Sequence, residues 1–210
     1  MEIIEYDEQH RQFRRRLKTF IEKEVAPFAD QWEKEHIAPK SVWRKMGKEG
    51  FLCPCVSETY GGAGGDFRYA LIVAEEMSRT RQSGLATSLH SDIVVPYIDA
   101  YASAKQKTKY LPGCISGDII TALAMTEPGA GSDLAGMQTT AEEQADEVII
   151  NGSKTFISNG INADLVIVAA KDPTEENPYN AISLYAVESG TPGFTRGRHL
   201  EKMGLHSQDT

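Results

Sequence analysis

The chain has 210 residues, of which 40% are hydrophobic and 25% charged, so its composition is that of a globular protein with room for one large domain or two small ones. A formal net charge of −8 argues against a nucleic-acid-binding protein, which needs a surplus of lysine and arginine. Apolar runs such as 165–170 are too short to span a bilayer, and the polar, acidic residues 1–10 match neither a signal peptide nor a transit peptide. We therefore expect a cytoplasmic protein with no membrane span.

The first part of the chain is predicted to be helical. One apolar stripe, with steps of three and four residues, consists of Phe13, Leu17, Phe20, Ile21, Val25, Phe28 and Trp32. Pro27 lies within this stripe and lacks the amide hydrogen that a helix interior needs, so the helix is expected to end or kink near Val25. A shorter helix is predicted over 42–48, ending near Gly50.

More helices follow along the chain. Asp66 is a candidate N-cap. The apolar stripe of the helix that it begins consists of Ala70, Val73, Ala74 and Met77. Another helix is predicted near 83–102, with Pro96 as a kink or break. Ser103 and Gln106 form a capping-box pattern for the last helix, which the Pro112-Gly113 pair is expected to close.

After Gly117 the periodicity changes to short runs typical of strands. Strands are predicted over 119–125, 147–150, 154–158, 165–170 and 181–187. Asn151-Gly152 predicts a hairpin between the second and third of these, because both central residues of such a turn need positive φ. The predicted domains are therefore a helical domain over 1–117 and a β-domain over 118–210.

The residues with the clearest chemical potential follow the first predicted strand. They read Ala-Met-Thr-Glu-Pro-Gly-Ala-Gly-Ser-Asp-Leu over 124–134. Glycines let backbone amides approach a ligand, and the hydroxyls of Thr126 and Ser132 add short-range donors, so a cradle for an anion or a ring edge is predicted. The segment matches neither a P-loop nor a dinucleotide fingerprint, which needs Gly or Ala where Leu134 stands. A plain glycine-rich turn is the alternative that these residues leave open.

No metal site is indicated by the sequence. Cys53, Cys55 and Cys114 are an odd number with C-x-C spacing, which fits neither a disulfide framework nor a zinc site. The histidines are scattered and form no HExxH motif. Three reduced thiols are expected.

The segment 124–133 resembles the flavin-binding segment of acyl-CoA dehydrogenases. Four further matches to that family occur in the same order: Tyr60-Gly61-Gly62 with Gly64-Gly65-Asp66, Asn151-Gly152-Ser153-Lys154, Phe156-Ile157-Ser158-Asn159-Gly160, and Lys202-Met203-Gly204 with Gln208-Asp209-Thr210. The residues over 157–160, 202–205 and 208–210 are most similar to the long-chain branch. Generic turns do not produce this ordered set.

The resemblance implies an α+β fold. An N-terminal all-helical domain precedes a β-barrel-like or β-sandwich middle domain, and a C-terminal helical bundle follows that these 210 residues do not include. The β-domain is also expected to be incomplete at its C-terminal end. The full-length protein is expected to be a homodimer or homotetramer.

The cofactor that the resemblance implies is FAD. The residues expected to bind it are Leu123, Ala124, Met125, Thr126, Gly131 and Ser132 on one side and Phe156, Ile157 and Ser158 on the other. Thr126 is expected to bond the polar edge of the isoalloxazine, and Ser132 to lie near both the pyrophosphate and the acyl-CoA substrate. Phe156 is expected to pack on the ring, and the Ser158 hydroxyl to reach the nitrogen that takes up hydride. Many relatives have Trp and Thr at these two positions, which keeps an apolar face and a hydroxyl.

The implied reaction is α,β-desaturation of an acyl-CoA thioester, as in the β-oxidation of medium- or long-chain fatty acids, with an electron-transferring flavoprotein as electron acceptor. The catalytic base is expected beyond Thr210, so no catalytic residue is assigned within the chain, which is expected to be inactive alone. Glu127 is the alternative base within the chain, and structuring the Thr-Glu-Pro turn is its expected role.

Two other functions stay open at this point. The same fold serves acyl-CoA oxidases and flavin monooxygenases, in which reduced flavin meets oxygen. A non-catalytic interaction protein derived from the fold is the second alternative, and the intact segment 124–133 argues against it.

Overall fold

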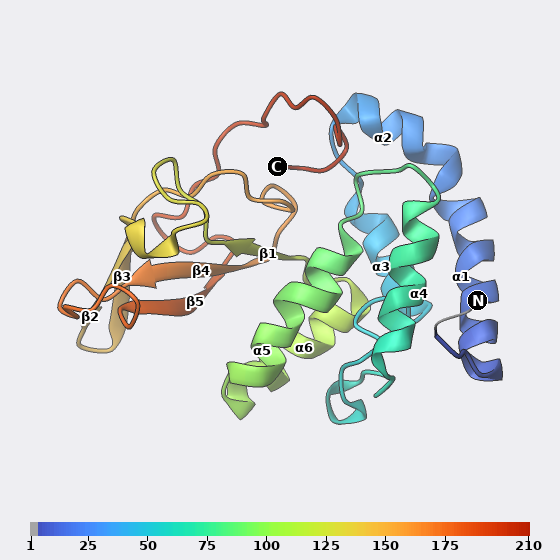
Figure 1. Ribbon diagram of the computed structural model, residues 1–210, viewed down its shortest axis with the longest axis horizontal. Helices are drawn as coiled ribbons and strands as arrows, with labels where there is room; N and C mark the ends of the chain where they lie inside the picture. The colour runs from blue at the N-terminus through green and yellow to red at the C-terminus, as the bar shows by residue number, and fades with distance from the viewer. Residues whose placement is uncertain (1–3) are drawn as a thin grey trace. The chain divides into compact units, whose positions relative to one another are not determined.

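The computed structural model describes residues 4–210, which form two compact units (Figure 1). The helical unit is the chain up to Ile120 together with Glu201–Asp209, and the β-unit is Thr121–Leu200 with Thr210. Residues 1–3, part of the polar start considered above, lie outside the described residues. The expected order of a helical domain and then a β-domain is confirmed.

The elements occur in the following order. The helical unit contains α1 (Glu8–Glu24), η1 (Ala26–Phe28), α2 (Ala29–Glu35), α3 (Lys40–Lys48), η2 (Glu58–Tyr60), α4 (Phe67–Ser78), η3 (Leu89–Val94), α5 (Val95–Tyr101) and α6 (Ala104–Ser116). The β-unit contains β1 (Thr121–Ala124), η4 (Leu134–Gly136), β2 (Thr140–Gln144), β3 (Glu147–Asn151), β4 (Leu165–Lys171) and β5 (Ile182–Glu188). None of the helices among the described residues combines the length and apolarity that a bilayer crossing demands.

Side-chain caps begin the three long helices α1, α4 and α6, and two of these caps were predicted from the sequence. Asp7 accepts a hydrogen bond from the amide three residues on at the start of α1, and Asp66 accepts from the amide two residues on at the start of α4. Ser103 and Gln106 form both bonds of a capping box at the start of α6. Each cap satisfies an amide that has no partner within its helix. The predicted caps at Asp66 and Ser103 are confirmed.

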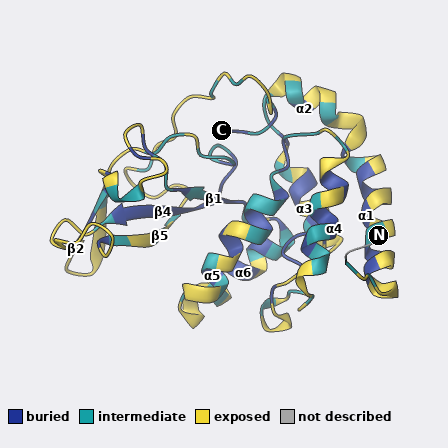
Figure 2. Cartoon of the chain, in the orientation of Figure 1, coloured by how far each residue is buried: buried dark blue, intermediate teal, exposed yellow. Residues whose placement is uncertain are grey.

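Proline ends the first helix as expected. α1 stops at its cap Val25, and Pro27 lies in the short 3₁₀ turn η1 before the chain resumes as α2. Every residue of the predicted apolar stripe except Phe28 is buried. Figure 2 shows the result as helices with one dark-blue face and one yellow face.

A wider, π-helical turn precedes Pro96 at the start of α5. The helix predicted near 83–102 begins only at Thr87, and the residues over η3 adopt π-helical geometry just before the proline. There the amide of Val95 donates to the carbonyl of His90, five residues back. The extra residue in this turn accommodates the ring of Pro96 without ending the helix.

The prediction that Pro112 and Gly113 close α6 is wrong. The helix contains Pro112 and ends at Gly117, which has φ of 76°. A proline in a helix interior costs about 3 kcal/mol. Leu111 and Cys114, on either side of it, are fully buried, so packing holds the last turn in place despite this cost.

Large apolar side chains from separate helices meet in the core of the helical unit. Its largest fully buried side chains include Leu17, Trp43, Met46, Phe51, Leu52, Ile72 and Leu111. Residues 201–209 join this unit through α2. The carboxylate of Glu33 accepts hydrogen bonds from the amides of His206 and Ser207 at 3.0 and 3.3 Å and from the Ser207 hydroxyl at 2.7 Å. A Cβ atom added to Gly84 would lie 3.0 Å from the Ser207 carbonyl oxygen, so backbone and side chains pack closely here.

The β-unit is built on a five-stranded mixed sheet in which β4 is the central strand. β4 pairs in parallel with β1 and antiparallel with β5 along its length, and a single pair, Thr140 with Lys171, joins it to β2. All residues of β4 except the last are buried, which explains why it reads as a continuous apolar run. The core on one face consists of Ala122, Ala124, Ala163, Val166 and Val168.

The hairpin predicted at Asn151-Gly152 is also wrong. The turn lies at Ala145-Asp146 and joins β2 to β3, with Gln144 paired to Glu147. Ala145 takes the positive φ of 54° that the sequence led us to expect of an Asn-Gly pair. Gly152 instead allows a close approach, because a Cβ atom there would lie 2.2 Å from the Thr139 hydroxyl. Residues 154–158 do not form a strand.

Replacing Gly117 with alanine is expected to destabilise the helical unit. Gly117 and Gly50 share φ of 76°, but a Cβ atom at Gly117 would lie 2.4 Å from the Trp43 carbonyl oxygen, whereas one at Gly50 meets nothing within 4 Å. Gly50→Ala measures the cost of the left-handed backbone, about 1–2 kcal/mol. Gly117→Ala adds a backbone clash worth about 1–3 kcal/mol more. Thermal unfolding followed by circular dichroism checks this, and equal losses of Tm in the two variants would contradict it.

Candidate functional site

The residues over 154–159 run beside β1 in the opposite direction. Near one end, the amide of Thr155 donates to the carbonyl of Thr126 at 2.9 Å. At the other end, the side-chain amide of Asn159 donates to the carbonyl of Thr121 at 3.1 Å. Two segments that lie far apart in sequence are therefore brought together, with Phe156–Ser158 held between the two hydrogen bonds.

This stretch contains an unusual backbone conformation. Phe156 has φ of 59°, in the left-handed region that a residue with a Cβ atom rarely adopts, and its side chain is 66% exposed. Strained residues cluster at active sites and ligand clamps, so Phe156 is a candidate ligand residue.

Three hydroxyl groups in the two sequence motifs have no hydrogen-bond partner among the described residues. Within residues 4–210, the hydroxyls of Thr126, Ser132 and Ser158 have no hydrogen-bond partner. Thr126 and Ser158 belong to the two segments that run side by side, and both are half-buried. Ser132 is exposed on the loop that follows, and no contact among the described residues joins it to Phe156. Thr126 and Ser158 therefore lie on two neighbouring segments, although it is Thr155, and not Ser158, that is bonded to Thr126.

The other predicted site residues divide between core and surface. Ala124 belongs to the core of the sheet, and Ile157 packs on the same core. Leu123 is half-buried, and Met125 packs on a second cluster formed by Ala130, Met137 and Ala169. Gly131 is exposed, with nothing within 4 Å of a Cβ atom built on it, so its backbone is open to a ligand.

A tight turn shapes the glycine-rich segment. The amide of Glu127 donates to the carbonyl of Ala130 at 2.8 Å, and the amide of Ala130 donates back at 3.2 Å. Pro128 and Gly129 lie exposed at the tip. Asp133 then caps η4 by accepting from the amide two residues on. Local hydrogen bonds thus fix the loop on both sides of Gly131.

The carboxylate of Glu127 is the anchor of this loop. It is 6% exposed and accepts hydrogen bonds from the amides of Gln138 and Thr139 at 2.6 and 3.0 Å, from the Thr139 hydroxyl, and from the ammonium of Lys154 at 2.8 Å. Lys154 also donates to the carbonyl of Met125 at 3.0 Å. Burial disfavours the charged carboxylate, but these donors outweigh it and lower the pKa of Glu127 to about 2.

This network gives Glu127 a structural role. A carboxylate with such a low pKa and with donors on both oxygens is a poor general base at neutral pH. This agrees with the turn-structuring role expected of it. The sequence did not identify Thr139, Lys154 or Asn159 as site residues, although Lys154 and Asn159 stand within the recognised motifs.

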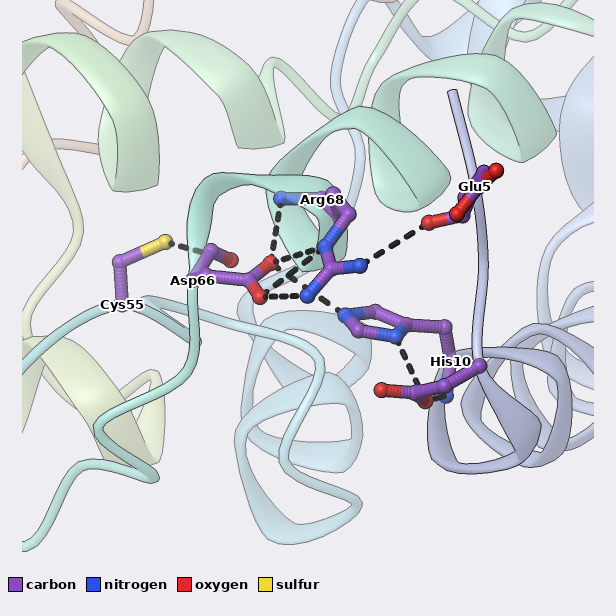
Figure 3. Close-up of polar contacts among 6 residues, drawn as sticks. Glu5, His10, Cys55, Asp66 and Arg68 are labelled. Carbon is purple, nitrogen blue, oxygen red and sulfur yellow. Dashed lines mark hydrogen bonds and ion pairs between the residues drawn. The ribbon is translucent and has the colours of Figure 1, made fainter. Parts of the chain in front are cut away.

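A second polar cluster lies at the start of α4 (Figure 3). Arg68 binds both oxygens of the Asp66 carboxylate and donates to the carbonyl of Glu5, and its guanidinium holds the pKa of Asp66 below the usual range. The ring of the buried His10 faces Asp66 at 3.3 Å. These contacts fasten the start of the chain to the cap of α4, and they form no cleft.

Cys53 and His90 form a third cluster, inside the helical unit. The Cys53 sulfur lies 3.6 Å from Nε2 of His90. Burial raises the pKa of Cys53 to about 12 and lowers the pKa of His90 to about 4, so both are neutral at neutral pH and neither is an activated nucleophile or base. No group of His, Cys, Asp and Glu side chains in the described part of the chain is arranged to hold a metal ion.

A helical unit followed by a mixed sheet, with a glycine-rich turn after the first strand, defines a two-domain α+β protein. Residues 7–118 match the family model of the acyl-CoA dehydrogenase N-terminal domain, and residues 122–210 match that of the middle domain. The chain therefore belongs to the acyl-CoA dehydrogenase family.

Relatives of known identity agree with this assignment. The mitochondrial long-chain specific acyl-CoA dehydrogenase of Mus musculus is 44% identical over 98% of this chain and 48% of its own length. The crystal structure of an acyl-CoA dehydrogenase from Geobacillus kaustophilus superposes with a TM-score of 0.95 and 54% identity, over 97% of this chain and 54% of that one. An acyl-CoA dehydrogenase from Bacillus anthracis, complexed with FAD, has a TM-score of 0.89 and 30% identity, over 98% of this chain and 35% of that one. The chain thus spans about half the length of the curated relatives it matches.

The network around Glu127 predicts an acid-sensitive stability of the β-unit. The pKa of Glu127 falls from about 4.5 unfolded to about 2 folded, so its contribution is complete above about pH 4.5 and is lost as the pH falls toward 2. Glu127→Gln is expected to cost about 3 kcal/mol at neutral pH, because it also leaves Lys154 buried without its charge partner. The double variant with Lys154→Met should recover part of this loss.

Urea unfolding at a series of pH values measures this effect. The difference between the wild type and Glu127→Gln should shrink as the pH falls below about 4.5. Glu8→Gln is the matched control, because Glu8 forms an exposed ion pair with Arg15 and should have little effect. A difference between wild type and Glu127→Gln that does not depend on pH would rule out the proposed network.

Proposed function

We propose that this chain is part of an FAD-dependent acyl-CoA dehydrogenase and that its β-unit holds the flavin. The proposal rests on one observation: Phe156 is exposed in a left-handed conformation, in a segment tied to β1 close to the free hydroxyls of Thr126 and Ser158. An aromatic face beside short polar groups suits a flat heteroaromatic ring with polar edges.

The available groups match the parts of FAD. Thr126 and Ser158 supply hydrogen-bond donors for the edge of the isoalloxazine, Phe156 supplies an apolar face, and Leu123–Met125 line it with backbone groups. The open backbone at Gly131 and the exposed hydroxyl of Ser132 suit the pyrophosphate and the adjacent substrate. When bound, FAD accepts the hydride that leaves the β-carbon of an acyl-CoA. The chain's own residues bind and orient the two reactants.

We assign the catalytic base to a region outside these 210 residues. The proposed flavin-binding segment contains two carboxylates: Asp133 caps η4, and the four hydrogen bonds and low pKa of Glu127 remove it as a candidate. The similarity to a long-chain specific relative favours medium- or long-chain acyl groups. In the complete protein we propose an electron-transferring flavoprotein as the electron acceptor and a homodimer or homotetramer as the assembly.

Ser158→Ala is expected to weaken FAD binding by the complete gene product. Loss of one hydrogen bond costs about 0.5–1.5 kcal/mol, which corresponds to a rise in Kd of roughly two- to twelve-fold. Ser153→Ala is the control, because Ser153 is an exposed serine a few residues away with no hydrogen bond to the site. Titration by flavin absorbance measures both. Equal affinities for wild type and Ser158→Ala would remove Ser158 from the site, and a wild type that does not bind FAD would remove the function.

The 210-residue chain supplied with FAD is expected to show no reduction of flavin by an acyl-CoA. Loss of a positioned base slows a reaction by about a hundred- to ten-thousand-fold. Anaerobic mixing with short- and long-chain acyl-CoAs, followed by the bleaching of flavin absorbance, tests this against the complete gene product. Bleaching by the chain alone at a comparable rate would mean that a base lies within it. Rapid recovery of the absorbance in air would favour an oxidase.

A further inference from the structure

We propose that Asn159 is a positioning residue, whose side-chain amide holds the turn Phe156–Ser158 against β1 and so sets the distance between the hydroxyls of Ser158 and Thr126. The consequence for flavin binding rests on the proposed function, whereas the tether itself does not. Asn159 is fully buried and is not among the residues proposed to bind the flavin.

Asn159 combines a left-handed backbone conformation with a side-chain hydrogen bond to β1. The residue has φ of 62°, which asparagine tolerates better than other residues with a Cβ atom. Its carbonyl accepts from the amide of Ala163 at 2.7 Å, so its backbone serves the next turn. The side-chain nitrogen donates to the carbonyl of Thr121 at 3.1 Å. Because a carbonyl only accepts hydrogen bonds, the nitrogen must be the atom that faces it.

The tether is attached to a rigid part of the sheet. Thr121 is fully buried and pairs with Leu165 of the central strand β4. At the other end of the segment, the bond from Thr155 to Thr126 provides the second attachment. Only Phe156–Ser158 lie between the two attachments, so their freedom relative to β1 is small.

The residues that follow Asn159 are held by separate hydrogen bonds. Arg196 donates to the carbonyl of Gly160 at 2.9 Å and to that of Ala163 at 2.6 Å. Loss of the Asn159 side chain therefore leaves the residues after it in place and loosens Phe156–Ser158. This makes the effect of Asn159 local.

The other atom of the Asn159 amide shows that packing alone does not explain this residue. Its side-chain oxygen is buried and has no hydrogen-bond partner among the described residues. An unpaired buried acceptor is destabilising. Glycine would adopt the left-handed conformation without burying such an atom. What asparagine adds, and glycine lacks, is the hydrogen bond to Thr121.

Two substitutions separate the hydrogen bond from the backbone conformation. Asn159→Gly and Asn159→Ala both remove the tether, but glycine favours the left-handed region and alanine does not. Asn180→Gly makes the same chemical change at an exposed loop position and serves as the control. The primary measurement is hydrogen exchange of the backbone amides of Thr155 and Gly160, which donate to the carbonyls of Thr126 and Ile157, in the 210-residue chain without any ligand.

In both Asn159 variants the amides of Thr155 and Gly160 are expected to exchange at least about tenfold faster than in wild type, with Tm of Asn159→Gly close to that of wild type. In the complete gene product, the Kd for FAD should rise roughly three- to tenfold in Asn159→Gly, with a changed shape of the flavin absorbance band. Asn180→Gly should leave all four readouts unchanged.

Each outcome decides a separate claim. If Asn159→Gly exchanges like wild type and only Asn159→Ala is faster, the backbone conformation is sufficient and the tether is refuted. Faster exchange with unchanged FAD affinity and spectrum would refute the positioning role. A wild-type protein that binds no FAD would end the proposed function, and the exchange result would still decide the tether.

Discussion

The buried ion pair between Glu127 and Lys154 is the interaction on which the β-unit's candidate site depends. Glu127 follows β1, Gln138 and Thr139 precede β2, and Lys154 follows β3, so one carboxylate ties the end of β1 to the paired ends of β2 and β3, with which β1 does not pair. The cost of burying the two charges is met by donors on both carboxylate oxygens and by the second bond from Lys154 to the Met125 carbonyl. The glycine-rich loop therefore keeps a defined position although its tip is exposed.

Other polar groups of the same segments have no hydrogen-bond partner within residues 4–210. The groups that hold the loop are buried and bonded, whereas the hydroxyls of Thr126 and Ser158 and the ring of Phe156 are left without partners in the described chain. Phe156 also keeps an exposed aromatic side chain at a positive φ of 59°. Under the proposed function, the bonded groups hold the loop in position, and the groups without partners are the ones proposed to bind the ligand.

The helical unit was predicted well because its signals are local: apolar stripes, Asp66 and Ser103 as caps, and Pro27 as a break. The errors arose where distant packing overrides a local signal. Burial of Leu111 and Cys114 carries α6 through Pro112, and the close approach of Thr139 uses Gly152 for space and not for a turn. Motifs located the candidate binding residues, but the partners that hold them, such as Thr139 for Glu127, become evident only when segments distant in sequence meet.

The attachment of His206 and Ser207 to Glu33 has a consequence for biosynthesis. Glu33 leaves the ribosome 173 residues before the amide of His206 that it binds. At typical translation rates of about 5–20 residues per second, residues 206 and 207, which bind Glu33 and pack on Gly84, are synthesised roughly ten to thirty seconds after Glu33. Throughout that interval the β-unit is being made while Glu33 of α2 has no bond to residues 206 and 207, so the helical unit gains its last contacts only after the β-unit has been synthesised.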